Sequence, residues 1–119
     1  PEGLEVRGVA KLLRRALRNL LENARRYSQG DITVVLQRHD GQAQLSVLDR
    51  GPGVPPALRE RIFEPFYRLP GASERAGGVG LGLALVRSIA ERHNGSVRCE
   101  DHTGGGACFV LRLPLALTK

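Results

Sequence analysis

Apolar side chains recur with a helical period near the start of the chain. Placed at 100° per residue, they fall in one broad arc, and most of the charged side chains lie on the opposite side. The apolar positions are Val9, Leu12, Leu13, Ala16, Leu17, Leu20, Leu21 and Ala24. The pattern predicts a core-facing amphipathic helix over residues 12–27.

A polar stripe follows one border of this apolar arc. Asn19, Asn23 and Arg26 are spaced by four and three residues, so they share one edge of the helix, with Tyr27 just inside it. Asparagine in mid-helix competes for backbone hydrogen bonds and is often only a solvated residue. Two asparagines followed by a cation can also hold a hard cation and a phosphate. This helix alone leaves both interpretations open.

Strand-like segments follow in two pairs. Residues 32–37 and 43–48 are separated by a turn at Asp40-Gly41, which predicts a β-hairpin with one buried face. Residues 95–100 and 107–113 form a second pair, joined by a glycine-rich turn. These segments predict two pairs of adjacent strands, one in each half of the chain.

Two further helices and an edge strand complete the expected fold. Residues 56–63 predict a short helix that starts at a proline, and residues 83–93 predict a second long helix that ends near Gly95. Residues 4–7 alternate and predict an edge strand before the first helix. We expect a two-layer α/β sandwich, in which a mixed, mostly antiparallel sheet of about five strands is covered on one face by about three helices.

Glycines gather in two segments where a ligand could approach the backbone. In Asp49-Arg50-Gly51-Pro52-Gly53 a carboxylate at the end of a strand precedes two glycines, although an Asx turn uses the same residue types. The segment 77–82 opens the second long helix, where free N–H groups favour an anion such as phosphate. Its glycine spacing fits neither a P-loop nor a dinucleotide-binding fingerprint. Residues 69–77 have little to pack, which predicts a mobile loop.

Composition and charge change this picture little. The chain has 119 residues, a formal net charge of +6 and no run of about 18 apolar residues, so we expect one soluble globular domain. Its basic residues lie mostly on one helix face without interleaved aromatic residues, which favours a solvated surface over a nucleic-acid site. Cys99 and Cys108 lie in two strands that are expected to pair, where they could approach one another. We interpret them as reduced packing residues of a cytosolic domain.

Four motifs together resemble the ATP-binding domain of bacterial two-component sensor histidine kinases. They match the N, G1, F and G2 boxes of that family in order and at the usual intervals, and the resemblance covers nearly the whole chain. The motifs are Asn19…Asn23, Asp49-x-Gly51-x-Gly53, Phe63-x-Pro65-Phe66 and Gly78-x-Gly80-Leu81-Gly82-Leu83. The resemblance implies the sandwich with a flexible ATP lid that gyrase, heat-shock-90 and mismatch-repair ATPases share, with ATP and Mg²⁺ as cofactors.

The resemblance assigns the polar stripe of the first helix to the phosphates. Asn23 would be the Mg²⁺ ligand, Asn19 its polar neighbour, Arg26 a cation facing the phosphates, and Tyr27 a flank of the adenine. In the ATPase relatives a glutamate at the Asn19 position activates the attacking water, whereas an amide cannot take up a proton at neutral pH. Glu22 faces the solvated side and is a poor substitute. A kinase is therefore favoured over a hydrolase.

The resemblance assigns the base and the rest of the triphosphate to the two glycine-rich segments. Asp49 would accept a hydrogen bond from the adenine amino group, and a carboxylate has no donor for the carbonyl that guanine carries there. Gly51 and Gly53 would give the base room, and residues 69–77 would form the lid. The residues that would meet the triphosphate are Arg68, Gly78, Val79, Gly80, Leu81 and Gly82.

The phospho-accepting histidine of the family lies on a separate helical dimerisation domain. Here His39 lies in a turn, and His93 and His102 have no acidic residue after them, so we interpret all three as structural or surface residues. The chain starts at Pro1 without a preceding element and looks cut from a longer protein. We therefore expect residues 1–119 to be the catalytic domain of a longer sensor kinase.

The resemblance also implies partners and a location. The whole protein would be a membrane-anchored homodimer of the bacterial inner membrane, with this domain in the cytoplasm. It would donate the γ-phosphate of ATP to its own dimerisation domain and signal through a cognate response regulator, without a nucleic-acid partner. Two alternatives stay open: an ATP-hydrolysing or serine-kinase relative of the same fold, and a nucleotide-binding interaction module without catalysis.

Overall fold

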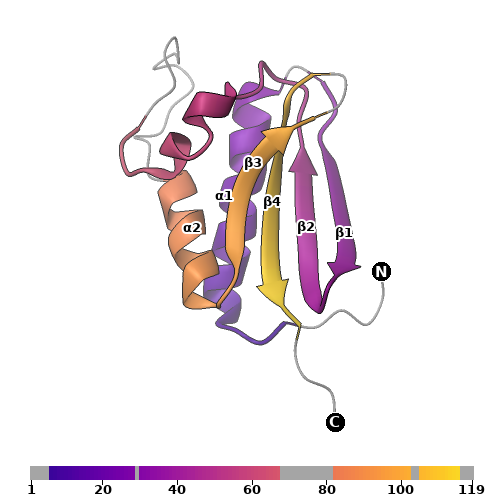
Figure 1. Ribbon diagram of the computed structural model, residues 1–119, viewed down its shortest axis with the longest axis vertical. Coiled ribbons are helices and arrows are strands. Elements are labelled where there is room, and N and C mark those ends of the chain that lie inside the picture. Colours follow the sequence, from indigo (N-terminus) through magenta and orange to yellow (C-terminus); the bar gives the residue numbers. More distant parts are fainter. Residues whose placement is uncertain (1–5, 29, 68–81, 103–104, 116–119) are drawn as a thin grey trace.

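Two α-helices pack against each other and cover one face of an antiparallel sheet (Figure 1). The computed structural model describes residues 6–28, 30–67, 82–102 and 105–115. Its elements in chain order are α1 (Ala10–Tyr27), β1 (Thr33–His39), β2 (Gln42–Leu48), the 3₁₀ turns η1 (Pro56–Leu58) and η2 (Arg61–Phe63), α2 (Gly82–Arg92), β3 (Ser96–Asp101) and β4 (Ala107–Pro114). The two-layer sandwich expected from the sequence is therefore present, with the predicted short helix split into two 3₁₀ turns. Within the described ranges, no helix is long and apolar enough to cross a membrane.

The sheet has the strand order β1-β2-β4-β3, and its three pairings are all antiparallel. The expectations of about five strands and of a mixed sheet are thus wrong for the part of the chain that the structure describes. Val6 and Arg7, at the described end of the expected first strand, pair with no strand. The chain bends at Gly8 to start α1, while Val6 packs against the core.

The turn between β1 and β2 has the geometry that its sequence predicts. Asp40 and Gly41 have φ angles of 47° and 76°, and His39 pairs directly with Gln42. Two consecutive residues with positive φ form a type I′ turn, whose twist matches that of the strands it joins. The turn therefore fixes the register of the hairpin.

Only β2 of this hairpin has the buried face that the sequence pattern predicts. Val47 is fully buried, whereas its cross-strand neighbour Val34 is 47% exposed on the same sheet face. Figure 1 shows β1 at the edge of the sheet, and helices α1 and α2 pack mainly over β2, β3 and β4. The expectation of a buried face on β1 is wrong because the helical layer is narrower than the sheet.

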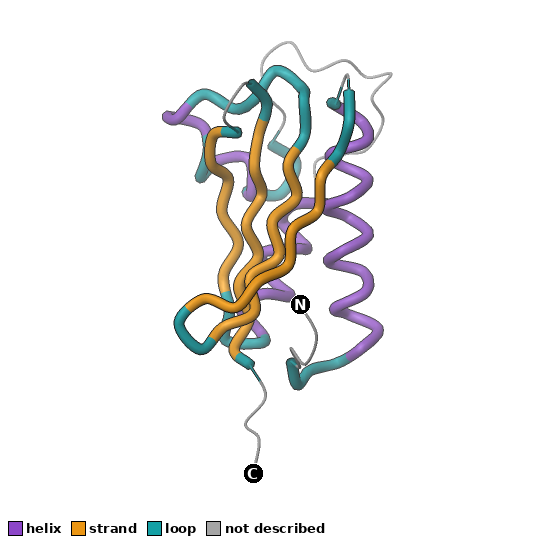
Figure 2. The backbone as a smooth tube through the Cα atoms, turned by 90° about the vertical axis from the view of Figure 1, so that its right-hand side faces the viewer, coloured by secondary structure: helices purple, strands orange, loops and turns teal. Residues whose placement is uncertain are grey.

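The core lies between the two layers, which Figure 2 shows from the side. Along α1, Ala16, Leu20 and Ala24 are fully buried, because they share the face that the apolar arc predicts. Their partners in the core include Val86, Ile89 and Ala90 of α2 and, near the end of the sheet, Phe63 and Phe109. The two phenylalanine rings meet edge to face with centroids 6.3 Å apart. Burying a side chain of the size of Leu20 contributes about 1.5–3 kcal/mol.

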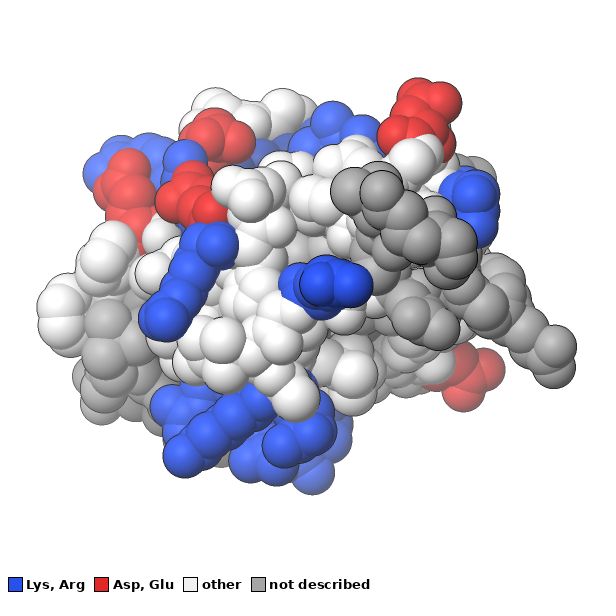
Figure 3. Space-filling view, turned by 90° about the horizontal axis from the view of Figure 1, so that it is seen from below, with Lys and Arg blue, Asp and Glu red and all other residues white. Residues whose placement is uncertain are grey.

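The outward face of α1 is basic, as the sequence indicates. Four basic side chains on the solvent side of the helix are exposed: Lys11, Arg14, Arg15 and Arg18. Seen from below, Lys and Arg side chains gather along one side of the molecule (Figure 3). This arrangement fits the interpretation of the basic residues as solvated surface.

The two cysteines lie on adjacent strands but on opposite faces of the sheet. Cys99 of β3 stands opposite Phe109, and Cys108 of β4 stands opposite Glu100, so the two thiols point away from each other. The expectation that they could approach one another is therefore wrong. Both are free and buried, and burial raises the pKa of the Cys99 thiol to about 12. They behave as packing residues, as expected.

Candidate nucleotide-binding site

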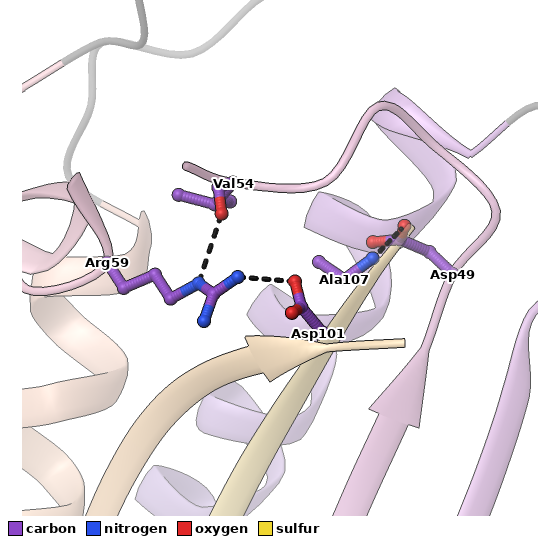
Figure 4. A network of polar contacts seen from close by, with 5 residues as sticks. All are labelled: Asp49, Val54, Arg59, Asp101 and Ala107. Atoms are coloured by element: carbon purple, nitrogen blue, oxygen red, sulfur yellow. Dashed lines mark hydrogen bonds and ion pairs between the residues drawn. The ribbon is translucent and has the colours of Figure 1, made fainter. Parts of the chain in front are cut away.

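A buried carboxylate stands at the end of β2. Asp49 is 3% exposed, and its Oδ1 accepts hydrogen bonds from the backbone N–H groups of Gly51 (2.9 Å) and Ala107 (3.0 Å). Figure 4 shows the bond from Ala107. Its own N–H donates to the Ala107 carbonyl at 2.9 Å. Among the described residues, Oδ2 has no hydrogen-bond donor. One oxygen therefore fixes the side chain, and the other is available to a ligand.

The loop that follows Asp49 is held against the end of α1. Arg50 N–H donates to Ser28 Oγ at 3.0 Å. A Cβ atom at Gly51 would lie 2.4 Å from the Tyr27 carbonyl oxygen, so only glycine fits there. The structure thus gives Gly51 a packing role between the loop and the helix, and Gly53 lies beside the backbone of Gly106.

The turn between β3 and β4 supports Asp49 from the other side. His102 Nδ1–H donates to the Asp49 carbonyl oxygen at 2.7 Å. Gly106 has a φ of +103°, and a Cβ atom there would lie 2.0 Å from the same oxygen. His102 and Gly106 were not among the site residues expected from the sequence, in which the glycine run around residue 105 indicated no more than a turn. His102 is a structural residue, as expected.

One residue of the polar stripe on α1, Asn19, contacts the start of α2. Asn19 Nδ2 donates to the Gly82 carbonyl oxygen at 3.4 Å. Asn23 and Tyr27 are half-buried further along the same helix, and Arg26 is exposed. The stripe therefore continues from the helix–helix contact toward the Asp49 loop, which packs on Tyr27.

Gly82, the first residue of α2, has no neighbour that requires glycine. A Cβ atom added there would meet no described atom within 4 Å, and its φ is not positive. As far as the described residues show, the space beside this backbone is open. The lid expected over residues 69–77 lies outside the described residues. So do the other residues expected at the triphosphate, which are Arg68, Gly78, Val79, Gly80 and Leu81.

The acidic residue on α1 points away from this site. Glu22 accepts a hydrogen bond from Arg25 at 3.0 Å on the exposed side of the helix, as its place on the helix predicts. Within the described ranges, no group of three or more His, Cys, Asp or Glu side chains could hold a metal ion.

Comparison with known proteins places this arrangement in a family. Residues 8–117 match the model of the histidine kinase-, DNA gyrase B- and HSP90-like ATPases. The chain is 41% identical over 117 residues to the sensor-like histidine kinase SenX3 of Mycolicibacterium smegmatis, a match that covers 96% of this chain and 30% of SenX3. It is 46% identical over 106 residues to the sensor protein RstB of Escherichia coli, a match that covers 88% of this chain and 24% of RstB. The chain thus spans less than a third of either relative.

Solved structures agree with the sequence matches. The mycobacterial sensor histidine kinase MprB matches with a TM-score of 0.83 and 35% identity, over 95% of this chain and 76% of that one. Full-length ShkA in complex with AMPPNP matches with a TM-score of 0.77 and 34% identity, over 90% of this chain and 22% of that one. The chain belongs to the family of histidine kinase-, DNA gyrase B- and HSP90-like ATPases, and within that family its sequence and fold match the catalytic domains of sensor histidine kinases.

Proposed function

We propose that this domain binds ATP with Mg²⁺ and donates the γ-phosphate to a histidine on a separate dimerisation domain, as part of a two-component sensor kinase. The observation that carries the proposal is the buried Asp49 carboxylate with one fixed and one available oxygen. A carboxylate accepts from the amino group of adenine, and it repels the carbonyl oxygen that guanine and hypoxanthine carry at the same position. The site therefore selects an adenine nucleotide.

The phosphates would lie between the polar stripe of α1 and the start of α2. Asn23 would supply an amide oxygen to Mg²⁺, with Asn19 beside it and Arg26 facing the phosphates. The open backbone at Gly82 leaves room for a phosphate at a helix N-terminus, where the helix dipole favours an anion. AMPPNP, the nucleotide in complex with full-length ShkA, is an ATP analogue and supports this choice of ligand.

Kinase chemistry is favoured over hydrolysis by the residues that line α1. The Asn19 side chain donates to a backbone carbonyl and has no basic atom that could take a proton from water. Glu22 is engaged by Arg25 on the solvent side of the helix. With neither residue able to activate water, the domain would hold ATP intact until an acceptor histidine arrives.

Phe66 is the candidate contact for the dimerisation domain. Its side chain is 68% exposed, although its backbone has a φ of +67°, which is costly for a bulky residue. A large aromatic side chain held outward at this cost suits a partner that covers it. The cognate response regulator, the homodimeric state, and the place of this domain on the cytoplasmic side of a membrane-anchored protein also belong to the proposal.

Phosphate transfer should require an added acceptor. We expect the domain incubated with γ-labelled ATP and Mg²⁺ to show negligible self-phosphorylation and very slow hydrolysis. Adding a helical dimerisation domain that carries the acceptor histidine should produce labelled acceptor, detected after gel electrophoresis. The same dimerisation domain with that histidine changed to alanine is the control. Rapid phosphate release by the domain alone would favour the hydrolase instead.

Gly82 gives a second test, because stability and binding should change in opposite directions. Gly82→Ala should raise the free energy of unfolding by about 0.5–1 kcal/mol, since alanine favours a helix and the space is open. It should weaken ATP binding by about tenfold or more if phosphate approaches this backbone. Chemical unfolding and calorimetry measure the two effects.

The matched control is Ser88→Ala, an exposed position in the middle of α2. It should also stabilise the helix slightly, with unchanged ATP affinity. If Gly82→Ala binds ATP as tightly as the wild type, phosphate does not approach the start of α2.

A further inference from the structure

Arg59, between the two 3₁₀ turns, connects three segments around Asp49 (Figure 4). Its Nε–H donates to the Val54 carbonyl oxygen at 3.0 Å, and its Nη2 donates to the carboxylate of Asp101 at the end of β3. The Arg59 side chain is 23% exposed, in contrast to the 81% of Asp101. The Arg59 side chain is thus mostly covered along its length, while its carboxylate partner faces solvent. A hydrogen bond between two charged groups is stronger than a neutral one.

These contacts close a ring of backbone and hydrogen bonds. From Asp49 the chain runs through the loop to Val54, whose carbonyl is held by Arg59. Arg59 holds Asp101, the next residue is His102, and His102 donates back to the Asp49 carbonyl at 2.7 Å. Among the described residues, the Arg59 side chain makes the one direct hydrogen-bonded link between Val54 and β3.

We propose that Arg59 is a positioning residue for base recognition, which rests on the proposed adenine site. The near end of this loop is held against α1 at Arg50 and Gly51, but its far part contains Gly53, so an unanchored Val54 would let that part sample several conformations. By fixing that end to β3, Arg59 forms the rim of the Asp49 pocket before the base arrives, and binding then costs less ordering. A planar guanidinium can bond a carbonyl and a carboxylate at once, whereas a lysine ammonium is a single point of charge.

The test compares ATP with inosine triphosphate, which carries a carbonyl in place of the adenine amino group. Calorimetry with Mg²⁺ is done at a temperature where circular dichroism shows every variant to be folded. In Arg59→Gln, ATP affinity should fall about tenfold, and inosine triphosphate affinity less than about twofold, because the weaker ligand gains little from the Asp49 contact. Arg59→Lys should lie between wild type and Arg59→Gln.

Two further sets of variants separate positioning from general stability. Asp101→Asn should lower the ATP preference in the same direction, and the double variant with Arg59→Gln should be no worse than Arg59→Gln alone, because both act through one ring. The control pair is Arg98 and Glu100, whose side chains are 3.0 Å apart on the other face of β3. Arg98→Gln and Glu100→Gln should leave both affinities unchanged.

The possible results distinguish this inference from the function on which it rests. If wild type prefers ATP but Arg59→Gln keeps that preference, or loses both affinities equally, Arg59 does not position the base site. If wild type binds ATP and inosine triphosphate equally, the adenine site itself is wrong. A loss of preference in the Arg98 and Glu100 variants as large as in Arg59→Gln would also overturn the role of Arg59.

Discussion

Asp49→Asn should lower ATP affinity by about 10- to 100-fold, the loss expected for a hydrogen bond to a buried charge. The substitution keeps an oxygen for the N–H groups of Gly51 and Ala107, so the fold should survive. It replaces the free oxygen with an amide nitrogen, which cannot accept from adenine and can donate to the carbonyl of guanine. The preference for ATP over GTP should therefore fall together with the affinity, as measured by calorimetry.

Asp40→Asn is the matched control for this change. It removes an exposed carboxylate at the β1–β2 turn, where asparagine tolerates the positive φ, and it should leave nucleotide binding unchanged. Asp49→Ala is less informative, because it would leave two buried N–H groups without their acceptor. Unchanged ATP affinity in Asp49→Asn would contradict the assignment of the base site.

Gly106→Ala should have the largest effect on stability. The new methyl group would lie 2.0 Å from the Asp49 carbonyl oxygen, and neither backbone can move without breaking the hydrogen bonds between the β3–β4 turn and β2. We expect the free energy of unfolding to fall by about 4 kcal/mol or more, which is large for one substitution. Urea unfolding followed by circular dichroism would measure it.

Gly105→Ala separates the collision from the cost of positive φ. Gly105 has a φ of +110°, close to that of Gly106, but a Cβ atom there would meet no atom of the described residues within 4 Å. Its substitution should cost about 1–3 kcal/mol, the strain of the backbone alone. Similar losses in the two variants would mean that the turn can shift away from Asp49, and that it does not hold the carboxylate rigidly.

The sequence predicts local features of this fold well, and contacts between distant segments poorly. The periodicity of α1 identifies the buried face with Leu20, and Asp40-Gly41 identifies a hairpin, because both depend on residues close in the chain. The exposure of β1 was missed because strand alternation does not reveal how wide the covering helical layer is. The strand expected over residues 4–7 is predicted from alternation between two glycines, and that pattern carries no information about pairing.

In the candidate site, too, local features can be predicted from the sequence and contacts between distant segments cannot. The sequence places Asp49 at a strand end beside glycines, and the family resemblance assigns it to the adenine, but its support by Ala107 joins residues 58 positions apart. The sequence around Arg59 gives no sign that the Val54 carbonyl and the Asp101 carboxylate lie beside its side chain. Roles carried over to Asn23, Arg26 and the glycines before α2 stay predictions, since they concern a ligand.

The opposite orientations of Cys99 and Cys108 give the protein two internal reporters of motion. A thiol reagent that modifies Cys99 must first reach the space between the helices and the sheet, whereas one that modifies Cys108 must reach the other side of the same strands. With the thiol pKa of Cys99 raised to about 12 by burial, the intact protein offers little thiolate there at neutral pH. The labelling rate of Cys99 relative to that of Cys108 would therefore report how often the helical layer separates from the sheet.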